Sequence, residues 1–219
     1  MSKWYKRIDW LNHGLEFFVV IIGILIAFQL QNFSESVKRK ETLANHRNFL
    51  LEETKDNQKS LKYALEKVNQ SIGNLDSLKN AIESEKNVWD IKTLALRLLD
   101  DSGYFYIRRN AYKTITESGD IRFLEFEEKK KIVSLYGYYD WTEAIQRNSY
   151  DGFDNYFDYL DANTDLYTAE VPDRSVFESR VFSNVLGTYR YLLQAKQNKY
   201  RDCLGQIELF LQNQDSLPH

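Results

Sequence analysis

Cysteine is nearly absent from this sequence, since Cys203 is the only one in 219 residues. A disulfide within the chain is therefore excluded, and a single thiol does not fix the compartment. Proline and glycine are also scarce, with 2 and 9 residues, and so few helix breakers favour long helices over a strand-rich fold. Positive charge is not in excess, because the net charge is -3 and the pI about 5.7. No nucleic-acid partner is expected, since such binding normally needs a basic face.

Motifs of known catalytic and metal-binding sites are missing from the sequence too. The three histidines, His13, His46 and His219, form no close ligand pair such as HExxH. Cys203 has no histidine nearby in the sequence, and no glycine-rich phosphate-binding motif occurs. We therefore predict no catalytic, cofactor-binding or metal-binding residues and lean against an enzyme. A catalytic site formed by carboxylates that are distant in the sequence and close in space stays an open alternative.

One long apolar run lies near the N-terminus. Every residue from Phe17 to Phe28 is apolar or glycine, and residues 15–31 are predicted to form a transmembrane helix. The 16 residues from Leu15 to Leu30 span roughly 24 Å as a helix, and a bilayer core needs about 30 Å. Extending the segment with its polar ends, from Asn12 to Gln31, closes the gap. A buried core helix is disfavoured because the run is apolar on all faces. A cleaved signal peptide is disfavoured because the end of the run lacks small residues in A-x-A spacing.

Residues 1–14 are predicted to form a basic tail at the membrane interface. Apolar side chains recur there at helical spacing, between cations that suit lipid headgroups. These residues are Trp4, Ile8, Leu11 and Leu15, with Lys3, Lys6 and Arg7 beside them. The two flanks of the run carry equal positive charge, so the positive-inside rule does not decide the orientation. We lean to an orientation with the N-terminus inside.

Two polar residues and one pair of small residues stand out in the run. Glu16 and Gln29 lie close to its two edges, where each can hydrogen-bond at the headgroup level. The alternative is that both face other copies of the same helix, since interhelical polar bonds contribute about 0.6–2 kcal/mol. Gly23 and Ala27 form a small-xxx-small pair that lets two backbones approach closely. These four residues are the candidates for self-association.

Residues 32–86 are predicted to form a long juxtamembrane helix, with helical bounds near Ser34 and Ser84. Its apolar residues recur in alternating steps of four and three, which places them on one stripe. They are Leu61, Leu65, Val68, Ile72, Leu75 and Ile82, with Leu50 and Leu78 near the same face. The stripe fits an intermolecular coiled coil and an ordinary bundle helix equally well.

Residues 87–219 are predicted to form a helical soluble domain. A loop containing Pro172 precedes its last helix, where Ser175 and Glu178 have the spacing of a capping box. A break of this helix near Gly187 is left open. The expected helices cover residues 88–101, 109–117, 125–159 and 175–212.

Aspartates recur every three or four residues late in the chain, at Asp151, Asp154, Asp158 and Asp161, followed by Asp165. On a helix they form an acidic stripe beside an aromatic one. The simplest interpretation is a solvated face next to a core face, and the alternative is a site for a divalent cation or a basic partner. The spacing does not match an EF-hand loop.

Arg108 and Arg109 follow a short aromatic stretch. The simpler interpretation gives them core and salt-bridge roles. The alternative is binding of lipid phosphate or stacking on nucleic acid, for which two arginines are weak evidence.

Two segments resemble a known family. Residues 16–33, EFFVVIIGILIAFQLQNF, are similar to the Glu-led strip of an uncharacterised family of single-span membrane proteins common in Bacteroidota (domain of unknown function 6090). Residues 111–120, AYKTITESGD, resemble that family's second signature, A-Y-x-x-L-x-x-S-G-D. Phe33 and Ile115 depart mildly from the family's Trp and Leu. The resemblance implies the bacterial inner (cytoplasmic) membrane and a helical domain, and it supplies no activity.

These observations predict an all-α fold with one N-terminal transmembrane helix, a long juxtamembrane helix and a helical-bundle soluble domain. We expect a membrane-anchored, self-associating protein that binds a protein partner or senses a signal, with the lipid bilayer and other copies of itself as partners. One alternative is a homo-oligomeric pore with Glu16 and Gln29 as polar rings. Another is a membrane-tethered enzyme that uses carboxylates such as Asp154 and Asp158. No cofactor is expected.

Overall fold

The computed structural model describes residues 10–100 and 102–214, so most of the predicted tail of residues 1–14 lies outside the described residues. The chain divides into two units, Met1–Asn48 and Phe49–His219, each of which is described by itself. All regular structure in the described residues is helical, which confirms the predicted all-α class. The elements are α1 (Trp10–Glu83), α2 (Val88–Arg97), α3 (Asn110–Glu117), the 3-10 helix η1 (Asp120–Phe123), α4 (Phe126–Asn163), α5 (Ser175–Glu178) and α6 (Arg180–Gln214).

Helix α1 runs for 74 residues without interruption, so the predicted span and juxtamembrane helix are one element. Proline is absent from this stretch, so every residue carries the backbone N–H that an uninterrupted helix needs. The helix ends just before Glu85, whose φ of 53° breaks the helical path. Asn87 then caps α2, because its Oδ1 accepts the Asp90 N–H at 2.8 Å.

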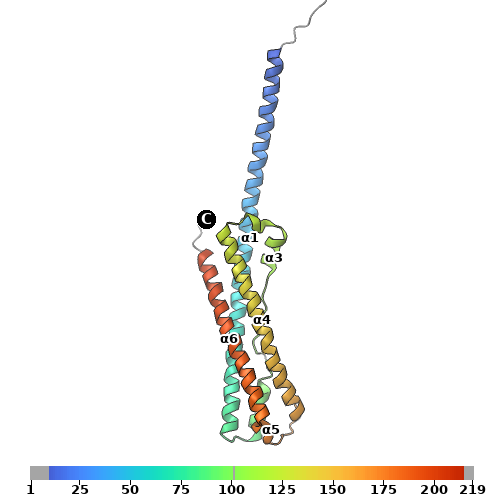
Figure 1. Ribbon diagram of the computed structural model, residues 1–219, viewed down its shortest axis with the longest axis vertical. Coiled ribbons are helices and arrows are strands. Elements are labelled where there is room, and N and C mark those ends of the chain that lie inside the picture. The colour runs from blue at the N-terminus through green and yellow to red at the C-terminus, as the bar shows by residue number, and fades with distance from the viewer. Residues whose placement is uncertain (1–9, 101, 215–219) are drawn as a thin grey trace, which may run out of the picture. The chain divides into compact units, whose positions relative to one another are not determined.

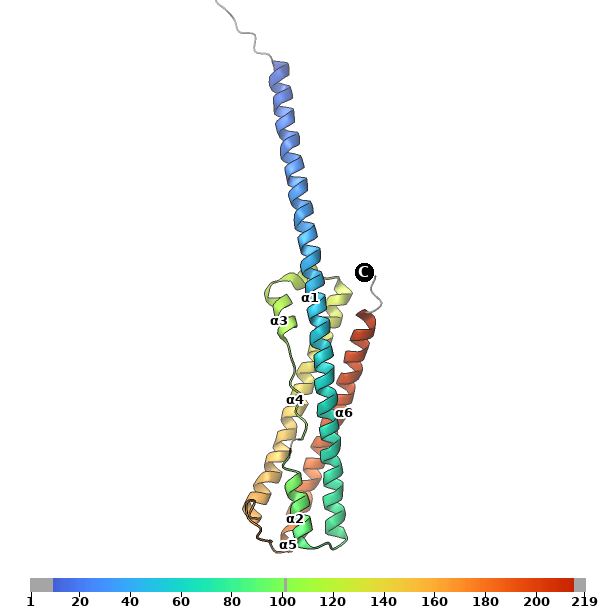
Figure 2. The same ribbon diagram turned by 180° about the vertical axis from the view of Figure 1, so that it is seen from behind.

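Three long helical segments lie alongside one another in the second unit: α1 from Phe49 onward, α4 and α6 (Figures 1 and 2). The remaining side is covered by α2, an extended segment and α3, which follow one another along the bundle. We call the extended segment, residues 102–109, the strap. The strap therefore occupies a place that a fourth helix would take in a four-helix bundle.

The core of the second unit is built from large aromatic and aliphatic side chains of α1, α2, α4 and α6. Leu61 and Val68 are completely buried, and Leu75 is nearly so. The stripe predicted on α1 therefore packs inside its own domain, and an intermolecular coiled coil through it is not supported. One cluster comprises Leu75, Leu78, Ala81, Ile91, Ala95, Leu98, Tyr156, Leu160, Phe177, Phe182, Tyr189 and Leu193.

Helix ends account for several differences from the sequence-based expectations. Helix α2 stops at Arg97, four residues before the expected end, because the next backbone N–H groups bond to carbonyls three residues earlier. Helix α4 continues to Asn163, past the expected residue 159. Helix α6 passes through Gly187 without a break.

The predicted capping box at Ser175 is wrong. Ser175 opens α5, a single turn that has no side-chain cap. The long helix α6 begins one residue after Ser179, whose Oγ accepts the Phe182 N–H at 3.0 Å. Glu178 pairs instead with Arg174, with 2.5 Å between Oε1 and Nε. Ser179, four residues after Ser175, therefore caps the start of α6.

Candidate functional site

The first unit contains the apolar run as an exposed helix. Among the described residues, one helix is long and apolar enough to cross a membrane. Its most apolar window has a mean hydropathy of 2.1, and no part of that window is buried. This exposure argues against the alternative of a buried core helix, because such a helix would be covered by its own domain.

The four self-association candidates do not share one face of α1. At about 100° per residue, Gly23 and Ala27 lie about 40° apart and Glu16 lies within about 20° of each. Gln29 lies about 140° from Glu16 around the axis. Straight helices cannot direct both polar residues toward one shared axis, so the geometry does not favour a pore lined by both.

The acidic stripe lies on the exposed face of α4. Asp151, Asp154, Asp158 and Asp161 are exposed, while the opposite face buries Gly152, Tyr156 and Leu160. This is the arrangement of the simpler interpretation, a solvated face next to a core face. No group of three or more His, Cys, Asp or Glu side chains in the described part of the chain could hold a metal ion.

Asp165 has a separate role in the loop after α4. Its Oδ1 accepts the backbone N–H groups of Tyr167 and Thr168 at 2.9 and 3.0 Å. These hydrogen bonds hold the pKa of the Asp165 carboxyl below its ordinary value. Asp165 therefore orders the loop and is not part of the stripe.

An open groove of about 650 Å³ lies between α1, α5 and α6. Its apolar lining includes Leu75, Ile82 and Phe177, and its rim carries both charge signs. The rim cations are already paired: Lys79 with Glu83 at 3.7 Å, and Arg190 with Asp76. The groove therefore offers no uncompensated charge that would select a ligand.

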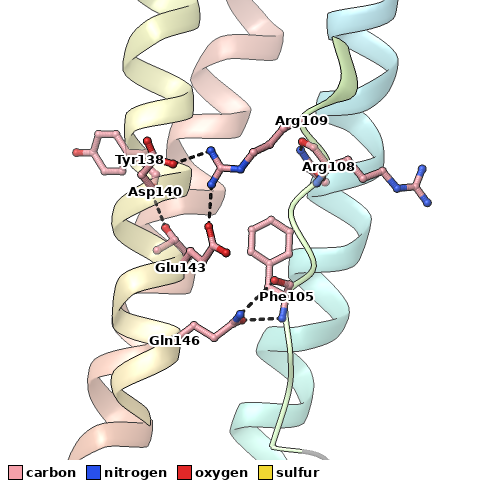
Figure 3. A network of polar contacts seen from close by, with 9 residues as sticks. Phe105, Arg108, Arg109, Tyr138, Asp140, Glu143 and Gln146 are labelled. Carbon is pink, nitrogen blue, oxygen red and sulfur yellow. Dashed lines mark hydrogen bonds and ion pairs between the residues drawn. The ribbon is translucent and has the colours of Figure 1, made fainter. Parts of the chain in front are cut away.

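The strap is held by side chains from the long helices, and two of these are amides that bind its backbone. The Gln146 amide of α4 accepts the Phe105 N–H at 2.8 Å and donates to the Phe105 carbonyl at 3.3 Å (Figure 3). The Asn57 amide of α1 does the same for Arg108, at 2.9 and 3.0 Å. Both amides are buried. Each one satisfies a donor and an acceptor of the same residue, as a neighbouring β-strand would.

Charged groups fasten the end of the strap to two helices. Arg109 pairs with Asp140 and Glu143 of α4, at 2.6 and 3.0 Å (Figure 3). Arg108 pairs with Asp56 of α1 at 2.5 Å. The salt-bridge interpretation of both arginines is therefore confirmed.

The beginning of the strap is fastened by α6 and by close packing. The Lys196 ammonium and the Tyr200 hydroxyl donate to the carbonyls of Ser102 and Gly103, both at 3.1 Å. Gly103 has a φ of 78°, and a Cβ there would lie 2.3 Å from the Ala64 carbonyl oxygen. No other residue type fits this backbone without strain. Glycine therefore lets the strap approach α1 closely.

A buried carboxylate holds the start of α3 next to the strap. Glu53 of α1 is 4% exposed; it accepts the Ala111 N–H at 2.9 Å and the Tyr136 hydroxyl proton. Tyr112 stacks on the Tyr136 ring with 4.1 Å between centroids. The carboxylate satisfies an N–H at the first turn of α3, where negative charge is favourable.

The second family-like signature, residues 111–120, therefore has a structural role. Ala111 and Ile115 are buried, and Tyr112 stacks as described. Gly119 adopts a φ of 77° directly after the helix, and the Ser118 Oγ accepts the Asp120 N–H at 3.3 Å. The signature docks and terminates α3.

A cation between aromatic rings joins α6 to α4. The Lys199 ammonium lies 3.0 Å from the centroid of the Trp141 ring and 4.5 Å from that of Tyr138. Burial lowers the pKa of this amine and raises that of the Cys203 thiol to about 11. Cys203 is therefore a protonated core residue near neutral pH.

Comparisons with known proteins add no relative. No protein-family model matches the chain, and neither a curated protein nor a solved structure is similar to it. The class that the fold defines is an all-helical protein with one apolar helix that meets the length and composition of a membrane span. The family resemblance of residues 16–33 and 111–120 stays a sequence-based interpretation.

Proposed function

We propose that this chain is a membrane-anchored, self-associating helical protein whose second unit binds a protein partner. The observation that carries this proposal is the exposed apolar part of α1, which continues as the first helix of a bundle with its own core. A fully apolar helical surface without cover is stable in hydrocarbon and unfavourable in water. An uncleaved anchor explains why the same helix carries both segments.

Self-association is assigned to the face of α1 that carries Glu16, Gly23 and Ala27. Small side chains let two helices approach closely, and a carboxyl group near the membrane edge gains from an interhelical partner. Gly23 has open space around its Cβ position, so nothing in the chain itself fills this face. By the family resemblance, the membrane is the inner membrane of a bacterium. The N-terminus is placed inside by the sequence-based lean, not by the resemblance.

Cross-linking in native membranes tests the self-association. Replacing both Gly23 and Ala27 by leucine is expected to reduce the cross-linked oligomer several-fold, because the larger side chains separate the helices. Gly14→Leu is the matched control, since Gly14 lies about half a turn from Gly23 on the same helix and its Cβ position is also open. A chain that is monomeric before any substitution would contradict self-association and leave the anchoring intact.

A further inference from the structure

The binding of the strap points to what the bundle recognises. Asn57 and Gln146 are 0% and 1% exposed, and each uses both polar atoms of its amide to bind the main chain of one strap residue. The Gln146 Oε1 also bonds to the Tyr200 hydroxyl of α6. Without an occupant, the Asn57 amide and the Gln146 Nε2 lose their buried partners. The site that the strap occupies on α1 and α4, which we call the strap site, is therefore complementary to an extended main chain, whichever protein supplies it.

Three side-chain requirements restrict which peptide sequences can occupy this site. Gly103 lies against Ala64, where no Cβ fits. Two residues on, Phe105 is 1% exposed and meets the Tyr139 and Tyr200 rings edge-on.

The third requirement is positive charge. The carboxylates that meet the end of the strap come from both α1 and α4, and they pair with its two arginines. They are Asp56, Asp140 and Glu143. This end of the strap site is thus complementary to cations.

We propose that the strap is an internal ligand, which an extended peptide from a partner protein replaces. The peptide has glycine, an aromatic residue two positions later and basic residues three and four positions after that. This inference rests on the proposed function and names the partner chemistry that it leaves open. The peptide can replace the strap because it reproduces the contacts that hold the strap on the bundle. These contacts are hydrogen bonds, ion pairs and one fully buried apolar side chain.

A synthetic peptide of residues 102–111 (SGYFYIRRNA) tests the exchange by fluorescence anisotropy on the full chain in detergent micelles. Gly103→Val in the chain keeps its own strap from seating, so the labelled peptide should bind this variant at least 10-fold more tightly than wild type. In wild type the strap competes at the high effective concentration of a tethered segment. Adding Asn57→Ala and Gln146→Ala to the variant should weaken binding at least 10-fold, and the peptide carrying G103V should not bind.

Several results would overturn the proposal. One is a helical Gly103→Val chain that binds the peptide no better than a scrambled one. Another is a complex between Gly103→Val and wild-type chains that the peptide blocks, because the occupant would then be a second copy. If Gly103→Val does not fold, hydrogen exchange of the wild-type chain shows whether the strap leaves the folded bundle. Exchange of the Phe105 and Arg108 amides ahead of core amides in α4 supports displacement, and exchange only by global unfolding contradicts it.

These readouts do not depend on membrane insertion or on the oligomeric state. Loss of peptide binding with an intact anchor and oligomer would remove only the strap inference. Loss of anchoring with intact peptide binding would remove only the proposed function.

Discussion

Asn57 lies in the interior of the bundle, and both polar atoms of its amide bind Arg108 of the strap. On the same helix, Asn69 is exposed and accepts one hydrogen bond from Gln197 at 2.6 Å. The two asparagines differ in burial and in what their removal leaves behind. Losing two hydrogen bonds made by a fully buried amide costs more than losing one surface contact.

Asn57→Ala is therefore expected to lower the free energy of unfolding by about 1–3 kcal/mol, because the Arg108 N–H and carbonyl lose their partner. Asn69→Ala is the control and should change it by less than about 0.5 kcal/mol. Urea unfolding followed by circular dichroism measures both. Equal effects of the two substitutions would contradict the role given to Asn57.

Buried ionisable groups make the bundle sensitive to alkali. Burial raises the pKa of Cys203 to about 11 and that of Tyr189 to about 12, and it raises the pKa values of Tyr136, Tyr139 and Tyr200 as well. The folded chain holds these groups protonated, whereas the unfolded chain releases their protons nearer the ordinary values of about 8.5–10. Their stabilising effect is thus complete below the unfolded pKa values and is lost as the pH rises through the folded ones.

The melting temperature should accordingly be flat up to about pH 8 and fall steadily between about pH 9 and 12. Thermal unfolding by circular dichroism at a series of pH values measures this. Tyr189→Phe removes one of the titrating groups and should make the fall less steep, whereas Tyr167→Phe, at a residue 91% exposed, should not. A melting temperature that stays constant to pH 12 would contradict the burial of these groups.

Sequence reasoning could not find the buried polar residues that hold the strap. Buried positions of α1 recur every seven residues at Leu50, Asn57, Ala64, Ser71 and Leu78, and two of these five are polar. A search for apolar periodicity passes over Asn57, because only the strap on the other side makes its burial favourable. The same search misses Gln146, because its partner Phe105 lies 41 residues away in the sequence.

At the scale of helices, the start of α6 shows how a cap is chosen. Ser175 has the capping-box spacing to Glu178, whereas Ser179 is followed by Arg180 and has Phe182 three residues on. The Ser179 Oγ nevertheless accepts the Phe182 N–H, and it also lies 2.8 Å from the Tyr159 hydroxyl of α4. Tertiary contact therefore selects the cap, although the local spacing favours Ser175.

Ser179→Ala should lower the free energy of unfolding by about 1–2 kcal/mol, the usual effect of losing an N-cap. Ser175→Ala changes the first residue of a one-turn helix, and we expect an effect within about 0.5 kcal/mol. Chemical unfolding of the two variants side by side measures the difference. A larger effect at Ser175 would restore the predicted capping box.

The long helices could be predicted from the sequence, because scarce proline and glycine and periodic apolar residues are local signals. The expected α4 began within one residue of Phe126, and α3 within one residue of Asn110. Helix ends and the strap were not readable. The strap has no regular hydrogen bonding of its own, and its extended path depends on side chains from three distant helices.

At the scale of the whole molecule, the account depends on the solvent around the apolar run of α1. The second unit buries its apolar stripe within its own core. The run from Phe17 to Phe28 is exposed along its length, which is the arrangement that the proposed membrane anchor requires. The local signal for this segment is its unbroken apolar run, and the helix geometry agrees with it.

Fractionation of cells that express the full chain tests this claim most directly, using a high-salt wash without detergent. We predict that the chain stays in the membrane pellet. Ile22→Lys combined with Ile26→Lys should move it toward the supernatant, since each charge in a span costs about 2.5–3.5 kcal/mol. A wild-type chain recovered in the supernatant as a folded, non-aggregated species would contradict the membrane anchor.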